Sequence, residues 1–269
     1  MTRPNGYNPS TDVGPVELRP WPEHDAIYEQ TEFPYVLSIQ SLQGGALEYI
    51  GALHTSDAAE PQLIEIEQRW AEFNPTVALC EGRARMFRFM SRPKSGKLSE
   101  SELIRILANR NGVRLFTLEP AYEVEVTGLI EHFEPKLVAT YLTLRVYSAE
   151  AKHSDQERDA LALGLMRKRT DVEGLRNTFS TISDLDAYWK ETFPNQHDWR
   201  TLPDIERVPM LHEVGNISRQ IRGEHMVRTI VELVARQEQV IAVVGASHVI
   251  RQEPALRKLI DSNPTTSAN

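Results

Sequence analysis

The first third of the chain alternates between two hydrophobic periods, which predict strands and helices in turn. Two β-rich runs, PYVLSIQS (34–41) and LEYIGALH (47–54), are joined by turn residues and predict a hairpin. From Pro61 the apolar residues repeat at the spacing of a helix, at Leu63, Ile66, Trp70 and Phe73. A short buried strand, TVALC (76–80), is predicted after this helix.

The same alternation returns further along the chain. Ser99 and Glu102 have the spacing of a capping box, which predicts the start of a helix that Asn111-Gly112 closes. Three further elements complete the pattern: the strand VRLFTL (113–118), a helix from about 217 to 237, and the strand VIAVV (240–244) before a short final helix.

A long segment interrupts this alternation. Residues 121–177 are predicted to be mostly helical, whereas residues 178–215 read as irregular and are rich in Trp, Pro and charged side chains. A long irregular segment inside a compact domain is often functional. We therefore interpret residues 121–214 as a helical cap or lid that is inserted into the rest of the fold.

The predicted fold class is α/β, with a central, mainly parallel sheet and helices on both faces, because strands alternate with helices. Its core is expected to combine residues 31–120 with residues 215–262, and the cap is inserted between them. The polar, proline-rich residues 1–30 are predicted to form an extended arm, and residues 263–269 a disordered tail.

Polar residues that follow the predicted strands are the candidates for a site, because ligands of an open α/β sheet bind at the carboxyl ends of its strands. These residues are His54, Glu81, Arg83, Glu119 and His248. The helix before the last strand must run antiparallel to that strand, so its early residues Arg219 and Arg222 should reach the same edge. His225, on the opposite side of this helix, is predicted to lie at the surface. Each candidate also has a structural explanation when taken singly, but their convergence predicts one functional site.

Two G-x-x-H segments, Gly51–His54 and Gly245–His248, each follow a predicted strand, and Cys80-Glu81-Gly82-Arg83 lies between them. The helix before the last strand carries Arg222 and Met226. This combination resembles the superfamily that joins TraB/GumN proteins, Tiki-type proteases, erythromycin-esterase-like hydrolases and ChaN-like haem-binding proteins. The family's helix usually reads R-[DE]-x-x-M.

The chain departs from the family pattern on that helix. Gly223 stands at the acidic position, and Glu224 comes one place later. Either Glu224 takes the role of the acid from a neighbouring direction, or the role is absent and the protein is a catalytically inactive scaffold. The resemblance implies an α/β fold with a pocket at the strand edge, but not one reaction, because members differ in chemistry.

The leading hypothesis is hydrolysis of an ester, a lactone or an amide. His54 or His248 would be the general base that activates water, since a neutral imidazole near pH 7 suits that task. Glu81 would orient a histidine or act as the base itself, and Arg222 would stabilise the oxyanion or hold a substrate carboxylate. Further substrate contacts are expected from Arg83, Glu119, Arg219 and Glu224.

Two alternatives involve a bound group. His54, Glu81 and His248 offer nitrogen and oxygen ligands that suit Zn²⁺, Mn²⁺ or Fe²⁺, as in the Tiki-type proteases that the chain resembles. A strand-edge histidine could instead ligate haem iron, as the ChaN-like resemblance implies. Trp189, for example, could then supply part of one wall of the apolar cleft that haem needs.

Composition narrows the possible partners. The 269 residues carry a formal net charge of −8, which argues against nucleic acid as the main partner. No apolar run approaches the ~20 residues that span a bilayer, and the N-terminus has no apolar signal-peptide core. A cytoplasmic protein with a small-molecule or peptide substrate is expected, and its oligomeric state stays open. The single cysteine, Cys80, excludes an intramolecular disulfide and is predicted to be a buried thiol.

Overall fold

The computed structural model describes residues 5–10, 13–82, 97–150 and 157–262. The chain divides into two compact units. The first combines Met1–Ala121 with Arg222–Asn269, and the second is Tyr122–Ile221. The cap is predicted over residues 121–214, and the second unit spans Tyr122–Ile221.

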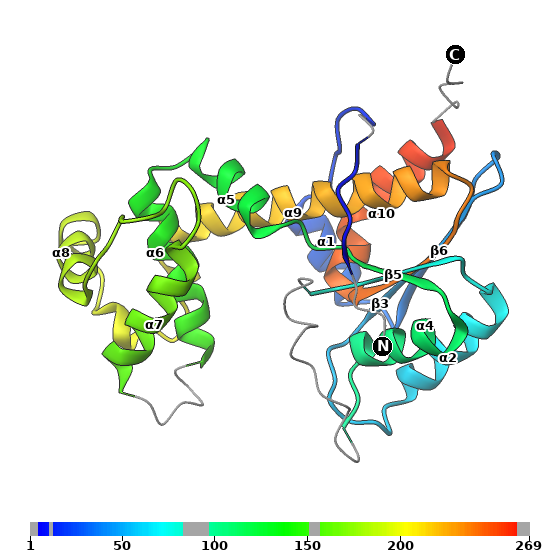
Figure 1. The fold of residues 1–269 in the computed structure, drawn as a ribbon, viewed down its shortest axis with the longest axis horizontal. Helices are drawn as coiled ribbons and strands as arrows, with labels where there is room; N and C mark the ends of the chain where they lie inside the picture. Colours follow the sequence, from blue (N-terminus) through cyan, green and yellow to red (C-terminus); the bar gives the residue numbers. More distant parts are fainter. Residues whose placement is uncertain (1–4, 11–12, 83–96, 151–156, 263–269) are drawn as a thin grey trace. The chain divides into compact units, whose positions relative to one another are not determined.

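The first unit is built on a mostly parallel sheet (Figure 1), which confirms the predicted α/β fold class. Its strands are β1 (Asn5–Gly6), β2 (Tyr35–Gln40), β3 (Ala46–Ala52), β4 (Val77–Cys80), β5 (Arg114–Thr117) and β6 (Gln239–Gly245). They are ordered β1-β5-β4-β6-β3-β2 across the sheet. Only the β2–β3 pair is antiparallel, as the hairpin prediction requires, and the other pairs are parallel.

Helices cover both faces of the sheet (Figure 1). One face packs against α9 (Pro209–Ala235) from Met226 onward and against α10 (Ala246–Ser262), and the other against α2 (Pro61–Phe73) and α4 (Glu100–Asn111). Side chains of β6 alternate between the two hydrophobic clusters: Val240, Ala242 and Val244 enter the first, and Ile241 and Val243 the second. This two-residue period is the one expected of a strand that is buried on both sides.

Local sequence signals set the helix ends where they were predicted. Helix α2 begins at Pro61, and α4 begins behind a capping box in which Ser99 and Glu102 each bond the other's backbone N–H. Gly112, with a φ of 67°, ends α4 in the left-handed conformation that glycine adopts readily. Cys80 is fully buried at the end of β4, as predicted.

The N-terminal residues are not the extended arm that was predicted. Strand β1 pairs with β5, and α1 (Trp21–Tyr28) forms a helix in which proline occupies the first turn, where no backbone N–H is needed. Val13 and Val16 are buried in the cluster beneath α9 and α10. In this segment proline therefore lies in the first turn of a helix as well as in extended chain. The predicted tail, residues 263–269, lies outside the described residues.

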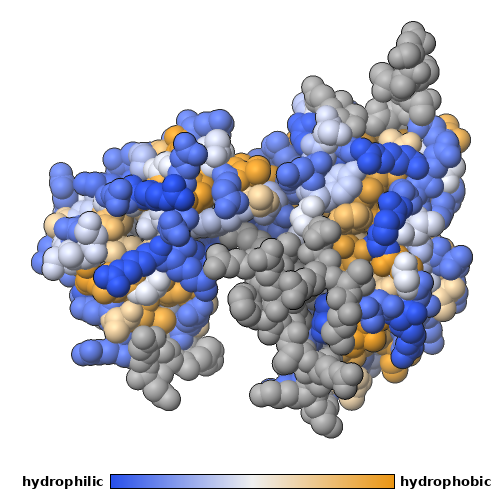
Figure 2. Space-filling model, in the orientation of Figure 1, coloured by the Kyte–Doolittle hydropathy of each residue, from blue (hydrophilic) through white to orange (hydrophobic). Residues whose placement is uncertain are grey.

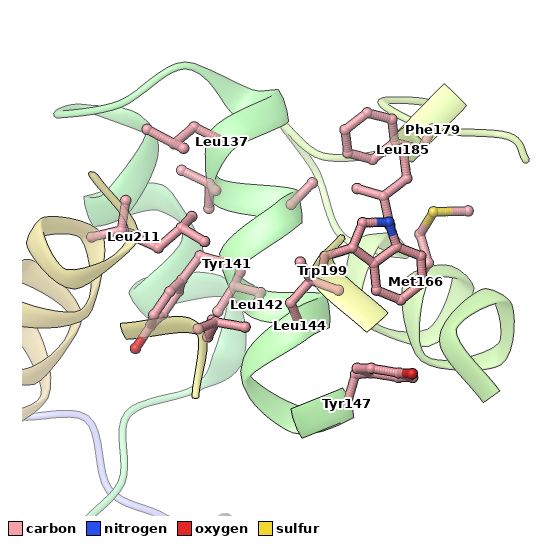
Figure 3. Packing of buried hydrophobic residues seen from close by; sticks show 14 of the residues in the cluster. Leu137, Tyr141, Leu142, Leu144, Tyr147, Met166, Phe179, Leu185, Trp199 and Leu211 are labelled. Carbon is pink, nitrogen blue, oxygen red and sulfur yellow. The ribbon is translucent and has the colours of Figure 1, made fainter. Parts of the chain in front are cut away.

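The second unit is helical and has its own hydrophobic core (Figure 3). Its elements are α5 (Tyr122–Ile130), α6 (Pro135–Glu150), α7 (Arg158–Thr170), α8 (Ile182–Thr192), the short 3-10 helices η1 (Trp199–Thr201) and η2 (Ile205–Arg207), and the start of α9. Tyr147 and Trp199 lie in this core with their rings 5.1 Å apart, edge to face.

The prediction that residues 178–215 are irregular is wrong. Helix α8 begins behind a capping box formed by Thr181 and Asp184, and α9 begins at Pro209, well before the expected start near residue 217. In both cases proline and tryptophan content masked ordinary start signals, a capping box and a proline in the first helical turn.

The described surface mixes hydrophilic and hydrophobic residues on the face shown in Figure 2, with hydrophilic residues prominent. Among the described helices, none combines the length and the apolar character that crossing a membrane would require.

Candidate functional site

The parallel strands of the sheet, among them β3, β4, β5 and β6, bring their carboxyl ends to one edge. In the parallel register Ala52 of β3 lies opposite Gly245 of β6, and Cys80 of β4 lies opposite Thr117 of β5. His54 comes two residues after Ala52, and Glu81 comes directly after Cys80. Cys80 also lies opposite Val243 of β6, so the register places the predicted residues from separate strands near each other.

Glu81 lies between the two histidines of the G-x-x-H segments. Its Oε1 is 3.5 Å from Nε2 of His248, and its Oε2 is 3.8 Å from Nε2 of His54. The backbone N–H of Gly245 donates a hydrogen bond of 2.8 Å to Oε2. His54, Glu81 and His248 thus form one cluster, the predicted centre of the site.

The same contacts keep Glu81 ionised. Burial opposes the charge, but the hydrogen bond and charge of His248, the N–H of Gly245 and the charge of His54 outweigh it and lower the pKa of Glu81 to about 2. A carboxylate with so low a pKa is a weak base at neutral pH. Glu81 is therefore better suited to hold and charge-stabilise the histidines than to abstract a proton itself.

His54 is held from its other side by Glu100, which sequence reasoning missed. The Nδ1 of His54 lies 2.5 Å from Oε1 of Glu100, and the Glu100 side chain is only 4% exposed, whereas that of His54 is 67% exposed. This hydrogen bond is the largest influence on His54; with the charges of Glu81 and Glu100 it raises the pKa of His54, although burial acts in the opposite direction.

A signal for Glu100 was present in the sequence. The capping box predicts that a helix starts at residue 100, and a helix that precedes a parallel strand begins at the carboxyl edge of the sheet. The same topological reasoning that selected Arg222 on the last crossover helix would have selected Glu100. The turn that carries His54 is braced as well, because Gln62 of α2 bonds both the N–H and the C=O of Leu53, at 3.0 and 2.6 Å.

The glycine of each G-x-x-H segment makes room for the other segment. A Cβ on Gly51 would lie 2.8 Å from the Cα of Ala246, where α10 begins, and 3.0 Å from Val249. A Cβ on Gly245 would lie 3.1 Å from Nε2 of His54 and 3.4 Å from Oε2 of Glu81. The two segments fit together because both positions lack a side chain.

Arg222 forms a two-pronged ion pair with Glu119. Its Nε donates a 2.7 Å hydrogen bond to Oε2 of Glu119, and its Nη2 donates to Oε1. Burial opposes the charge of Glu119, but Arg222 outweighs it and lowers the pKa of Glu119, which also feels the charges of His248 and Glu81. The pair therefore adjoins the cluster, and the roles predicted for its members toward a substrate remain predictions.

The other predicted substrate contacts are distributed differently. Arg219 lies in the second unit, where its guanidinium donates 2.8 Å hydrogen bonds to both oxygens of Glu206. Glu224, two residues after Arg222 on α9, projects about 200° around the helix from it, so the same helix face does not carry both. Arg83 lies outside the described residues.

His225 is buried, contrary to the predicted surface position, and burial lowers its pKa. The N-terminal residues, which are predicted to form an extended arm, pack on this helix, and the backbone of Tyr7 makes a hydrogen bond with His225. On another side of the same helix Leu18 reaches Gly223, where a Cβ would lie 2.6 Å from the Cδ1 of Leu18.

The described residues do not fit the proposed bound groups well. Within the described ranges no group of three or more His, Cys, Asp or Glu side chains has the arrangement needed to hold a metal ion. Trp189 is buried in the core of the second unit. It also lines a hollow of about 460 Å³ there, whose lining residues include no histidine to ligate haem iron.

Comparison with protein-family models gives no match for this chain, and comparison with curated proteins gives none either. The functional interpretation therefore depends on the geometry of the site.

Proposed function

We propose that the protein hydrolyses an ester, lactone or amide bond at the cluster formed by His54, Glu81 and His248. The observation that carries the proposal is the His54–Glu100 pair: an exposed imidazole whose Nδ1 is held by a buried carboxylate. With the Nδ1 proton donated to Glu100, the neutral ring presents a lone pair on Nε2. That arrangement suits a general base, because its tautomer and orientation are both fixed.

The proposed reaction uses one water molecule. Nε2 of His54 removes a proton from the water as its oxygen attacks the carbonyl carbon, and the carbonyl electron pair moves onto the oxygen. The tetrahedral intermediate then collapses, the bond to the leaving group breaks, and the proton passes from His54 to the leaving oxygen or nitrogen. Glu81 stabilises the imidazolium that forms between these steps, since it stays ionised.

His248 supplies a second imidazole across Glu81. It lies in the first turn of α10, where backbone N–H groups are not bonded within the helix and the helix dipole favours negative charge. We place the developing oxyanion near this turn, with His248 beside it. We further propose that the chain is related to the erythromycin-esterase-like hydrolases of the superfamily that it resembles.

A panel of substrates tests the proposal. Rates with 4-nitrophenyl acetate, an aliphatic lactone and a peptide 4-nitroanilide are compared between the wild-type protein and His54→Ala. We expect at least one bond class to be hydrolysed about 10²–10⁴-fold faster by the wild type, the usual contribution of a positioned base. Equal rates for both proteins with all three probes would contradict it. Loss of activity in EDTA that Zn²⁺, Mn²⁺ or Fe²⁺ restores would favour the metal-dependent alternative.

Replacing Glu100 by glutamine should change both the rate and its pH dependence. The glutamine amide can donate to Nδ1 and so favours the tautomer with the proton on Nε2, which should lower kcat by about 10²-fold or more. Because Glu100 raises the pKa of His54, its loss should lower that pKa. The rise of kcat/KM with pH should then move to lower pH. Profiles of kcat/KM against pH measure this shift.

Glu102→Gln is the matched control for this experiment. Glutamine preserves the capping box with Ser99 and leaves the contact between His54 and Glu100 in place. Its pH profile should match that of the wild type. An unchanged profile in Glu100→Gln would show that the His54 base is not oriented by Glu100.

A further inference from the structure

Three polar or sulfur-containing side chains meet in the otherwise hydrocarbon core beneath α9 and α10. They are Tyr49 of β3, Met226 of α9 and Gln252 of α10, and each is no more than 1% exposed. The hydroxyl of Tyr49 donates a 2.8 Å hydrogen bond to Oε1 of Gln252. The amide nitrogen of Gln252 donates to the sulfur of Met226 at 3.3 Å. We call these residues the buried triad.

Polar atoms in this hydrophobic core need hydrogen-bond partners. An amide or hydroxyl that is buried without a partner costs about 1–3 kcal/mol, and the surrounding cluster is made of aliphatic and aromatic side chains. The two hydrogen bonds therefore fix how β3, α9 and α10 lie against each other. A hydrocarbon contact would allow small sliding movements that hydrogen bonds resist.

Two members of the triad lie on the same helix as a residue of the site, and each comes four residues after it. Met226 comes four residues after Arg222 on α9, and Gln252 comes four residues after His248 on α10. Residues four apart share one face of a helix and lie one turn from each other. Tyr49 is in the strand that leads to the segment Gly51–His54.

Electrostatics agree with this placement. Burial raises the pKa of Tyr49 far above its usual range, and the charges of Glu81 and Glu119 raise it further. The carboxylates of the site are therefore close enough to act on the triad. The family-like spacing between Arg222 and Met226 also acquires a physical meaning, because the sulfur is the acceptor that joins α9 to α10.

We propose that Tyr49, Met226 and Gln252 are positioning residues for the site. The triad locks β3, α9 and α10 one turn away from the edge, so that His248 keeps its place beside Glu81. This inference rests on the proposed function, since only a reaction at the cluster gives the positioning a purpose. None of the three residues touches the reacting atoms.

Tyr49→Phe and Met226→Leu test the inference, since each removes one polar atom with little change of shape. We expect kcat to fall about 10- to 100-fold, the effect of a displacement on the order of 1 Å, with KM changed less than about twofold. In NMR spectra the ring signals of His248, assigned through His248→Gln, should shift or broaden. Those of His54, which Glu100 holds, should stay in place.

Tyr147→Phe is the matched control. The Tyr147 hydroxyl is also buried, but it has no hydrogen-bond partner among the described residues and lies in the core of the second unit. This variant should leave kcat and both histidine signals unchanged. Thermal unfolding of each variant checks that the fold is retained.

The NMR comparison separates the two proposals. Unchanged His248 signals in both Tyr49→Phe and Met226→Leu would overturn the positioning role, whether or not the protein hydrolyses the probes. If the His248 signals shifted but the wild-type protein hydrolysed none of the probes, the role of the triad in positioning His248 would be supported. The proposed function would then be contradicted. If Tyr49→Phe and Met226→Leu changed kcat no more than Tyr147→Phe does, the inference would also be overturned.

Discussion

Replacing His248 by alanine is expected to lower hydrolysis by about 10²–10⁴-fold while the protein stays folded. The imidazole is the direct partner of Glu81, at 3.5 Å, and lies in the first turn of α10, where the oxyanion is proposed to form. Alanine suits a helix, so α10 should be preserved. Initial rates with the responding probe, together with circular dichroism, measure the two effects.

His132→Ala is the control for this substitution. His132 is an exposed histidine of the second unit, so its loss should not alter the rate. If His248→Ala and His54→Ala both kept wild-type activity, the cluster would not be the catalytic centre. A loss in one of them alone would assign the general base or acid to that histidine and leave the other a supporting role.

Replacing Glu119 by glutamine is expected to destabilise the protein by about 3–5 kcal/mol, the cost of leaving the partner of a buried ion pair unpaired. The side chains of Glu119 and Arg222 are only 5% and 17% exposed. Glutamine keeps the shape of Glu119 but removes the charge that balances Arg222. Urea unfolding at neutral pH measures the difference in the free energy of unfolding between the two proteins.

The pH dependence of that difference has a defined direction. Because the pKa of Glu119 is lowered in the folded protein from its ordinary value of 4.5, its ionisation stabilises the fold above that value. The stabilisation is lost as the pH falls through the lowered pKa, so wild type and variant should converge in acid. The double variant Glu119→Leu with Arg222→Met should recover much of the stability, because no charge is left unpaired. A single variant as stable as wild type at pH 7 would contradict a stabilising pair.

Periodicity and topology predicted the centre of the site from sequence. Once β3, β4 and β6 are recognised as parallel strands, His54, Glu81 and His248 must meet at one edge. Pairing between side chains did not follow from that reasoning. Whether Arg222 reaches a substrate or Glu119 depends on side-chain distances of a few ångströms, which strand order does not determine.

The errors had a common physical origin. Residues 1–30 and 178–215 were interpreted from proline and polar content, yet both contain helices. Proline forbids a helix interior but suits the first turn, so its position relative to a capping residue matters more than its frequency. The wrong prediction for His225 has the same origin, because residues of the predicted extended arm pack on its helix and the backbone of Tyr7 makes a hydrogen bond with it.

The central position of β6 has a consequence for how the protein forms during synthesis. Strands β3 and β4 do not pair with each other; β6 lies between them and is made more than 150 residues after β4. The ribosome must therefore release residues 239–245 before the sheet can close. The second unit, Tyr122–Ile221, has its own core and is complete by then. Glu81 can contact Gly245 and His248 only after these residues are made, so the cluster of His54, Glu81 and His248 should be among the last features to assemble. If the proposed function is correct, a truncated nascent chain should be inactive.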